Sequence, residues 1–329
     1  MNLRSHNFSV VGVMKSIRGN ITLFISHDAR MEGTCQYIEE LVHEWMRQLE
    51  TLAEIAKSEP QAAYSSFTAG FKHKMTYYIR TIPNLKELLK PLDEVIDTKF
   101  IPAITEGHNC SDTDRRLLAL PVRMGGMGIP VFTKFCEQEY RNSRAATQQL
   151  TTKIQQQQHE YNIDIAAEKE VQTQIRKERE ERDKKELEAI RQTMTLEQLR
   201  GNDVAQMKGA SAWLNALPLK DEGFVLNKRE FFDAVALRYR WQLKRLPLAC
   251  VCGKRFDMDH AMSCMTGGYI HRRHDKLRDL FAKVLNDVAH SVQTEPPLQP
   301  LSGEQLPPNS NREDEARLDN AARGFLARI

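Results

Sequence analysis

The sequence predicts a mainly α-helical protein whose C-terminal part is a small α+β region. Three observations support this fold class. Between residues 36 and 100, apolar side chains recur at three- and four-residue steps, the period of an amphipathic helix. The run from Val131 to Arg200 contains no glycine and no proline, the residues that interrupt helices. Cysteines and a histidine gather at 250–264, a pattern typical of a small metal-stabilised module.

Three helices are expected in the N-terminal part of the chain. The first covers 36–60, and Pro60 ends it. A second is expected over 61–80. A third covers 84–100, where Pro91 should kink the helix or begin a new one. We interpret the apolar stripes of these helices as core packing rather than as binding residues.

Two further segments complete the globular part. Residues 117–130, LLALPVRMGGMGIP, contain three glycines and two prolines, which predict a loop in which backbone freedom matters. Beyond residue 200 the composition is again globular, with Trp213 and Leu214 expected in the core. A helix is expected from about Lys228 to Leu243, because its apolar residues keep the helical spacing.

The glycine- and proline-free run is expected to form one long helix over 140–200. It is rich in Gln, Glu, Lys and Arg, and residues 168–191 hold eight acidic and eight basic side chains. Opposite charges three or four residues apart support a solvated helix. Its apolar positions are too sparse for a strong coiled-coil seam, so we expect an exposed helical spacer. These elements divide the chain into a helical region at 1–135, the spacer at 136–200, a helical linker region at 201–246 and the cysteine-containing region at 247–329.

Positive charge is concentrated late in the chain. The net charge is +3, yet residues 228–283 hold 13 Lys and Arg against 6 Asp and Glu, a local excess of +7. Such an excess favours a polyanionic partner, DNA or RNA, and an ordinary solvated surface is the alternative. The candidates for phosphate contacts near the helix expected at 228–243 are Arg238, Arg240, Lys244 and Arg245.

No membrane partner is expected. Mean hydropathy is −0.54, and no apolar run approaches the ~18 residues that a membrane-spanning helix needs. The N-terminus lacks the apolar core of a signal peptide. Of the six cysteines, three are scattered and three are clustered, which suits one metal site in a reducing compartment, nuclear or cytoplasmic, rather than a disulfide framework.

The cluster Cys250-x-Cys252-x7-His260-x3-Cys264 predicts a structural zinc site. Three thiolates and one imidazole can close a tetrahedral zinc shell. His260 and Cys264 are four residues apart, so one helical turn places them on the same face. The first pair is one residue closer than the commoner C-x2-C spacing. Three buried cysteines beside a core histidine are the alternative interpretation.

A basic segment follows the cluster. An apolar stripe from Leu277 to Val288 predicts a helix, and cationic side chains crowd its N-terminal end, where helices favour anions. These are His271, Arg272, Arg273, His274, Lys276 and Arg278. We interpret them as phosphate contacts; a solvated helix face is the alternative, and either histidine could also compete for the metal.

Acidic residues near the C-terminus suggest a nuclease-like site. Glu295, Asp314, Glu315 and Asp319 are candidate ligands for Mg²⁺, which cutting nucleases hold between converging carboxylates. No acidic residue and no lysine follows Asp319. A polar loop and a short strand are the alternative.

Taken in order, these segments resemble the C-terminal part of reverse transcriptase polyproteins from non-LTR retrotransposons that carry a restriction-like endonuclease. The blocks that carry the resemblance are PQAAYSSFTAGFKHKMTYYIRTIP (60–83), FIPAITEG (100–107), RLLALPVRMGGMGIP (116–130), GASAWLNALPL (209–219), the Cys/His cluster, RRHDKLRD (272–279), EPPL (295–298) and EARLDNAARGF (315–325). The resemblance implies a thumb- and connection-like helical region first, then a zinc knuckle and the start of a PD-(D/E)XK-type nuclease fold.

Two departures from the family pattern bear on the polymerase and nuclease activities that the resemblance implies. The chain contains no Asp-Asp dipeptide of the kind that holds Mg²⁺ in a polymerase palm. Asp319 resembles the first nuclease carboxylate, and its family partner has no counterpart before Ile329. We therefore expect a nucleic-acid-binding remnant without polymerase or nuclease activity. The alternatives are a host-adopted interaction protein that uses the long helix as a partner surface, and a nuclease completed by another subunit. The sequence leaves the oligomeric state open.

Overall fold

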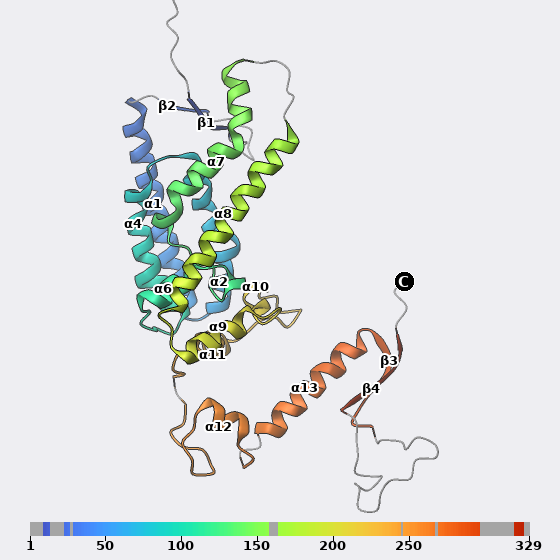
Figure 1. Ribbon diagram of the computed structural model, residues 1–329. Coiled ribbons are helices and arrows are strands. Elements are labelled where there is room, and N and C mark those ends of the chain that lie inside the picture. The colour runs from blue at the N-terminus through green and yellow to red at the C-terminus, as the bar shows by residue number, and fades with distance from the viewer. Residues whose placement is uncertain are drawn as a thin grey trace, which may run out of the picture. The chain divides into compact units, whose positions relative to one another are not determined.

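The computed structural model shows a mainly helical chain (Figure 1). It describes residues 9–13, 23–26, 29–157, 164–244, 246–266, 269–296 and 319–325. The chain divides into two compact units, Met1–Leu243 and Lys244–Ile329, which are described separately. The first unit includes the whole predicted spacer, 136–200, and nearly all of the predicted helical linker region, 201–246.

The first unit contains one two-stranded antiparallel sheet and a series of helices. The sheet is formed by β1 (Ser9–Val13) and β2 (Leu23–Ser26). The helices are α1 (Ala29–Ala56), α2 (Pro60–Ser66), α3 (Lys72–Thr81), α4 (Lys86–Val95), α5 (Ile101–Ile104), α6 (Asp112–Ala119), α7 (Phe132–Gln155), α8 (Ile165–Arg191), α9 (Leu196–Gln206), α10 (Ala212–Asn215) and α11 (Lys228–Tyr239). Shorter helical segments are η1 (Phe67–Phe71), η2 (Ile96–Phe100) and η3 (Val122–Met124).

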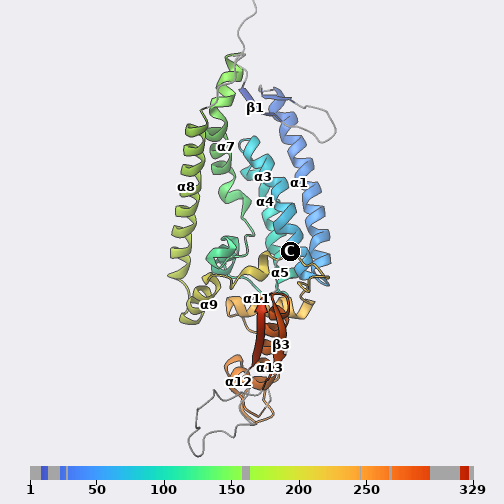
Figure 2. The same cartoon turned by 90° about the vertical axis from the view of Figure 1, so that its right-hand side faces the viewer.

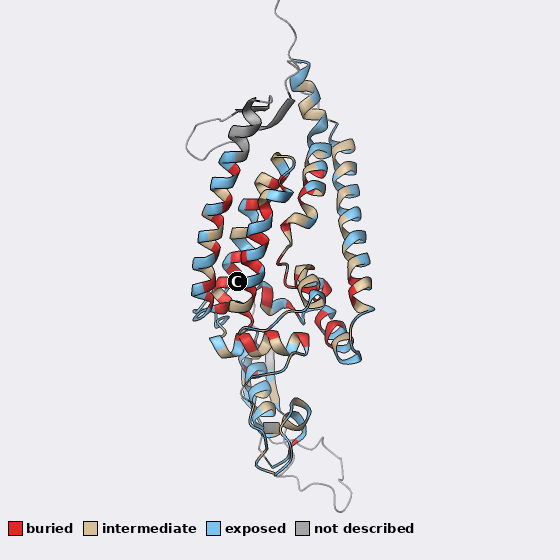
Figure 3. Cartoon of the chain, turned by 90° about the vertical axis from the view of Figure 1, so that its left-hand side faces the viewer, coloured by how far each residue is buried: buried red, intermediate tan, exposed pale blue. Residues whose placement is uncertain are grey.

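The core of the first unit lies on the inward faces of these helices (Figure 3). The stripe predicted on the first helix is buried at Ile38, Trp45 and Leu49 of α1, as its spacing indicated. Phe67 and Phe100 fill the space between helices, with ring centroids 4.7 Å apart. Each such side chain stabilises the fold by about 1.5–3 kcal/mol on burial.

Pro60 acts differently from the prediction, and for Pro91 one of the two predicted alternatives is excluded. The first helix ends at Ala56, and Pro60 is the first residue of α2. This position suits proline, because its ring presets φ and its missing N–H has no partner in a first helical turn. Pro91 lies inside α4 and does not begin a new helix.

The long exposed helix predicted over 140–200 is instead two long helices, α7 and α8, followed by α9. Both views show α7 and α8 side by side (Figures 1 and 2). Glu139 of α7 is buried and binds two arginines, Arg179 of α8 at 2.6 Å and Arg80 of α3 at 3.2 Å. Ile190 at the end of α8 is fully buried. A few buried groups thus hold a mostly charged helix against the unit.

The predicted glycine loop covers 117–130, but residues 117–119 form the end of α6. Distant side chains fix the remaining loop, residues 121–130. Those that donate hydrogen bonds to its carbonyl oxygens are Tyr64, Lys72, Arg115, Asn202 and Arg238. The Tyr64 hydroxyl lies 2.7 Å from the carbonyl oxygen of Met127. Nη2 of Arg238 lies 3.1 Å and 3.2 Å from those of Val122 and Gly126. Arg238 is therefore a structural residue of the first unit, not the phosphate contact that its sequence position suggested.

The glycines of this loop are required by its geometry, as predicted. Gly125 adopts a φ of +88°, which side-chain-bearing residues rarely do. Gly126 is required by space, because a Cβ there would lie 1.9 Å from the carbonyl oxygen of Leu120. Gly70, in the exposed part of η1, has nothing within 4 Å of the same position.

The second unit is built from α12 (Met258–Ser263), α13 (Tyr269–Asn286), β3 (Ala289–Thr294) and β4 (Asn320–Phe325). The strands pair antiparallel, with Thr294 opposite Asn320, and α13 packs against β3. Ala282 of α13 is buried. The apolar stripe predicted on this helix is largely exposed, with Leu280 at 57% and Phe281 at 62% of their full accessible surface.

We predict that Gly126→Ala lowers the free energy of unfolding of the first unit by about 2–3 kcal/mol, because the new methyl group collides with backbone. Gly70→Ala is the matched control, and its effect should stay within about 1 kcal/mol. Tryptophan fluorescence during urea denaturation measures this unit alone, since the three tryptophans of the chain, Trp45, Trp213 and Trp241, all lie in it. Equal midpoints for both variants would contradict the prediction.

Candidate metal centre

Cys250 and Cys252 lie on a tight turn. Two short stretches approach each other antiparallel around them, with a bridge between Ala249 and Arg255. The backbone N–H of Cys250 donates to the carbonyl oxygen of Lys254 at 2.8 Å, which closes the turn. Gly253 permits the reversal with a φ of +83°, the backbone freedom that the sequence indicated.

His260 lies in α12, and Cys264 directly follows this helix. Asp257 caps the start of the helix, and its carboxylate accepts a hydrogen bond from the backbone N–H of His260 at 2.7 Å. Cys264 is the C-cap residue, and its N–H donates to the carbonyl oxygen of His260 at 2.8 Å. One helical turn therefore sets the imidazole and the thiol on the same side, as the four-residue spacing predicted.

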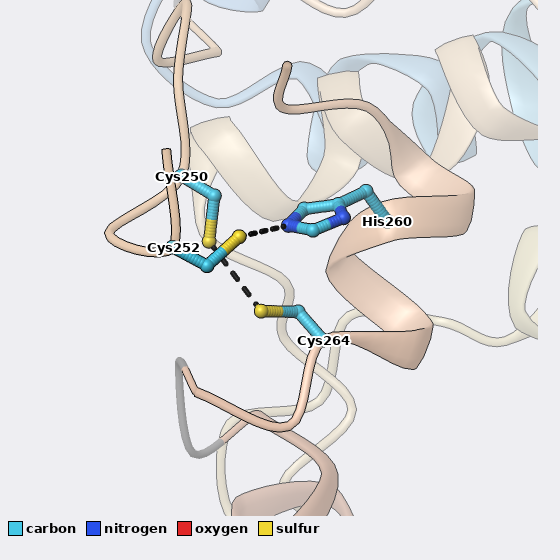
Figure 4. A group of neighbouring side chains, drawn as sticks. All are labelled: Cys250, Cys252, His260 and Cys264. Atoms are coloured by element: carbon cyan, nitrogen blue, oxygen red, sulfur yellow. Dashed lines mark hydrogen bonds between the residues drawn. The ribbon is translucent and has the colours of Figure 1, made fainter. Parts of the chain in front are cut away.

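The four side chains converge (Figure 4). Their ligand atoms all lie within 4.8 Å of one another. Sγ of Cys250 is 3.6 Å from Sγ of Cys264, and Sγ of Cys252 is 3.1 Å from Nε2 of His260. A zinc ion with Zn–S bonds of about 2.3 Å holds tetrahedral sulfur ligands about 3.8 Å apart, close to the first of these distances. The donor set, the spacing and the partial burial fit a closed structural zinc site.

Neither nearby histidine joins this cluster. Within the described ranges, the Cys₃His group is the one set of three or more potential ligands close enough to share an ion, and it includes neither His271 nor His274. His271 is exposed on α13. His274 instead lies with its Nε2 3.3 Å from a carboxylate oxygen of Asp319. The competition for the metal that the sequence left open is therefore not seen.

The cations predicted on α13 fall into two groups. Arg272 and Lys276 are exposed, and neither forms an ion pair within the part of the chain that the structure describes. Nη1 of Arg273 lies 3.6 Å from Sδ of Met262 in α12. Arg278, by contrast, is surrounded by acidic groups, and its side chain is only 15% exposed.

Three carboxylates neutralise Arg278. It contacts Asp275 at 3.2 Å, Asp279 at 2.9 Å and also Glu295. These contacts raise the pKa of the guanidinium above its usual value, with the hydrogen bond to Asp279 as the largest cause. Arg278 therefore has little positive charge left to offer a phosphate.

The remaining predicted cations lie around the boundary of the two units. Arg240 ends α11 in a left-handed conformation, with a φ of +57°, so the helix predicted to reach Leu243 stops earlier. Arg240 and Lys244 are both exposed, the first in the N-terminal unit and the second at the start of the C-terminal unit. Arg245 lies outside the described residues.

The strand pairing brings two of the predicted carboxylates together. Glu295 follows β3 and Asp319 precedes β4, and the backbone N–H of Glu295 donates to the carbonyl oxygen of Asp319 at 3.1 Å. The carboxylate of Glu295 contacts the guanidinium of Arg278, and that of Asp319 contacts the imidazole of His274. The sequence did not reveal these contacts, because they depend on the strand register. Asp314 and Glu315 lie outside the described residues.

We predict one zinc ion per chain in protein purified without chelator. Cys252→Ser combined with Cys264→Ser should reduce zinc to background, whereas Cys110→Ser, a cysteine of the first unit, should leave it unchanged. Zinc should also be released as pH falls, because protons compete for the thiolates and the imidazole. Elemental analysis measures the stoichiometry, and equal zinc in all three proteins would rule the site out.

Comparison with known proteins adds no assignment to this geometry. No protein-family model, no curated protein and no solved structure matches the chain. In the described part of the chain, no helix combines enough length and apolarity to cross a lipid bilayer.

Proposed function

We propose that this chain is a zinc-stabilised nucleic-acid-binding protein derived from a retroelement reverse transcriptase with an endonuclease region. The observation that carries the proposal is the position of an exposed basic helix end directly after the Cys₃His cluster. α13 begins at Tyr269, five residues beyond the last ligand, Cys264. The order of sequence blocks that resembles such proteins supports the retroelement origin.

Zinc would fix the start of α13. α12 and α13 are in contact, and the Arg273 side chain reaches back to Met262 within the metal-binding module. A bound ion would thus stabilise the start of α13, and this part of the helix orients the cations near its N-terminus. Its part is structural, since three thiolates and an imidazole leave no open coordination position for a substrate.

We assign the phosphate contacts to cations of α13 that form no ion pair with a carboxylate of the described residues. Arg272 and Lys276 lie in the N-terminal half of α13, where the helix dipole adds positive potential. Arg278 is not part of this surface, because its charge is compensated. Contacts of this kind follow the backbone of a strand and do not read bases, so DNA and RNA both fit and sequence preference should be modest.

We predict that affinity for nucleic acid falls steeply with salt and that Arg272→Ala with Lys276→Ala flattens this dependence. Each lost phosphate contact should lower the slope of log K against log salt by about 1. Fluorescence anisotropy with a labelled duplex measures both slopes.

The control removes the same number of charges elsewhere. Lys90→Ala with Lys99→Ala takes two exposed lysines from the first unit, both already paired with glutamates. This variant should keep the wild-type slope. If binding of the wild-type protein does not respond to salt, a protein partner becomes the better proposal.

Cleavage is not part of the proposed function. Glu295 contacts Arg278 and Asp319 contacts His274, so a Mg²⁺ ion would have to displace both contacts, and no third carboxylate of the described residues lies close enough to share the ion. We therefore expect no Mg²⁺- or Mn²⁺-dependent nicking of plasmid DNA. Metal-dependent nicking that disappears in Asp319→Ala would show that the site is a working nuclease.

A further inference from the structure

A pocket of about 410 Å³ opens within the first unit, between the α2–α3 helical segment, the loop 121–130 and α10. Its helical wall is one continuous face, formed by Tyr64, Ser65, Thr68, Ala69 and Lys72. The volume lies in the range of about 300–1,000 Å³ that is usual for small-molecule sites. None of the phosphate contacts proposed above lines it.

Lys72 gives this pocket its charge. Its Nζ lies 3.4 Å from the carbonyl oxygen of Gly128, and no carboxylate of the described residues forms an ion pair with it. An ammonium group has three donors, so this contact leaves donors for a ligand. Partial burial lowers the pKa of the Lys72 ammonium, because burial disfavours the charged form. No acidic residue lines the pocket.

A second cation stands at the rim. Arg123 lines the pocket from the loop and is exposed. Arg123 also interacts electrostatically with Glu180 of α8. The pKa of Glu180 is lowered chiefly by its hydrogen bond to Lys184, and the charge of Arg123 contributes less. Lys72 is therefore the principal anion-binding group, and Arg123 adds positive potential at the entrance.

The remaining lining residues indicate that the ligand has an apolar part as well as an anionic group. Val122, Leu214 and Leu217 form an apolar wall, and the pocket is larger than a phosphate ion requires. A cation beside an apolar wall suits a ligand with an anionic group on a flat organic body. Such pockets place a few polar groups to orient a mostly apolar ligand.

We propose that this pocket binds a nucleoside monophosphate group, with its phosphate at Lys72 and its base on the apolar wall. The choice of a nucleoside as the organic body rests on the proposed function; the anion site does not. The group has two sources, a free nucleotide or one nucleotide of a bound strand. Both present the same phosphate ester to the pocket.

Calorimetric titration of the full chain with AMP, GMP, CMP or UMP tests the proposal. At least one nucleotide should bind, inorganic phosphate should compete, and adenosine without phosphate should bind about tenfold more weakly or worse. Lys72→Gln should weaken nucleotide binding by about tenfold or more, whereas Lys74→Gln, an exposed lysine of the same helix, should not. Ala69→Trp should block the pocket while keeping Lys72.

A competition experiment distinguishes the two sources of the nucleotide. Competition between a single-stranded oligonucleotide and the nucleotide identifies the strand as the source, and its absence identifies the free nucleotide. Absence of nucleotide binding, or equal affinity in wild type, Lys72→Gln and Ala69→Trp, overturns the proposal. The double variant Arg272→Ala with Lys276→Ala changes α13 and should leave nucleotide binding by the pocket intact. Nucleic-acid binding through α13 and nucleotide binding at the pocket can therefore fail independently of each other.

Discussion

The arrangement of the first unit depends on satisfying the backbone carbonyl groups of one irregular loop. Residues 121–130 lack a strand or long helix to pair with, and carbonyl groups inside a protein need donors. Tyr64, Lys72, Arg115, Asn202 and Arg238 supply them from α2, α3, α6, α9 and α11. Because each donor stands on a different helix, the loop fixes these helices relative to one another. A shift of any one of them would leave a carbonyl group unpaired, at a cost of about 1–3 kcal/mol.

The second unit, by contrast, buries few apolar side chains. Its buried apolar residues within the described ranges are Cys264, Ala282 and Ala289, too little apolar surface for a core of its own. The Cys₃His cluster could compensate, because a metal bound there would supply free energy of folding directly. The exposed Leu280 and Phe281 show how little of α13 the two strands cover. The first unit thus has a dense apolar core, whereas the second has a group of four side chains that could hold a metal.

Patterns with short range could be predicted from the sequence, and contacts between distant segments could not. The buried face of α1 and the convergence of His260 with Cys264 follow from helical spacing alone. The division into α7 and α8 did not, because no glycine or proline marks the end of α7 at Gln155. The burial of Glu139 between Arg80 and Arg179 could not be predicted either, because in sequence it looks like any solvated acid. A local excess of lysine and arginine likewise could not show that Arg278 is neutralised. Asp275 and Asp279 are its neighbours in sequence, but the contact with Glu295 requires the strand register.

The pairing of Arg278 has a consequence for the electric field of α13. Field lines from this guanidinium end on three nearby carboxylates, so its charge contributes little at a distance. The field that reaches solvent comes instead from Arg272 and Lys276, nearer the start of the helix, and is reinforced by the backbone dipoles. α13 therefore presents a graded potential, positive near its start and negative around Arg278, where three carboxylates surround one guanidinium. A polyanion of the class proposed above would be turned toward the end of α13 next to the Cys₃His cluster before it made contact, and orientation would precede recognition.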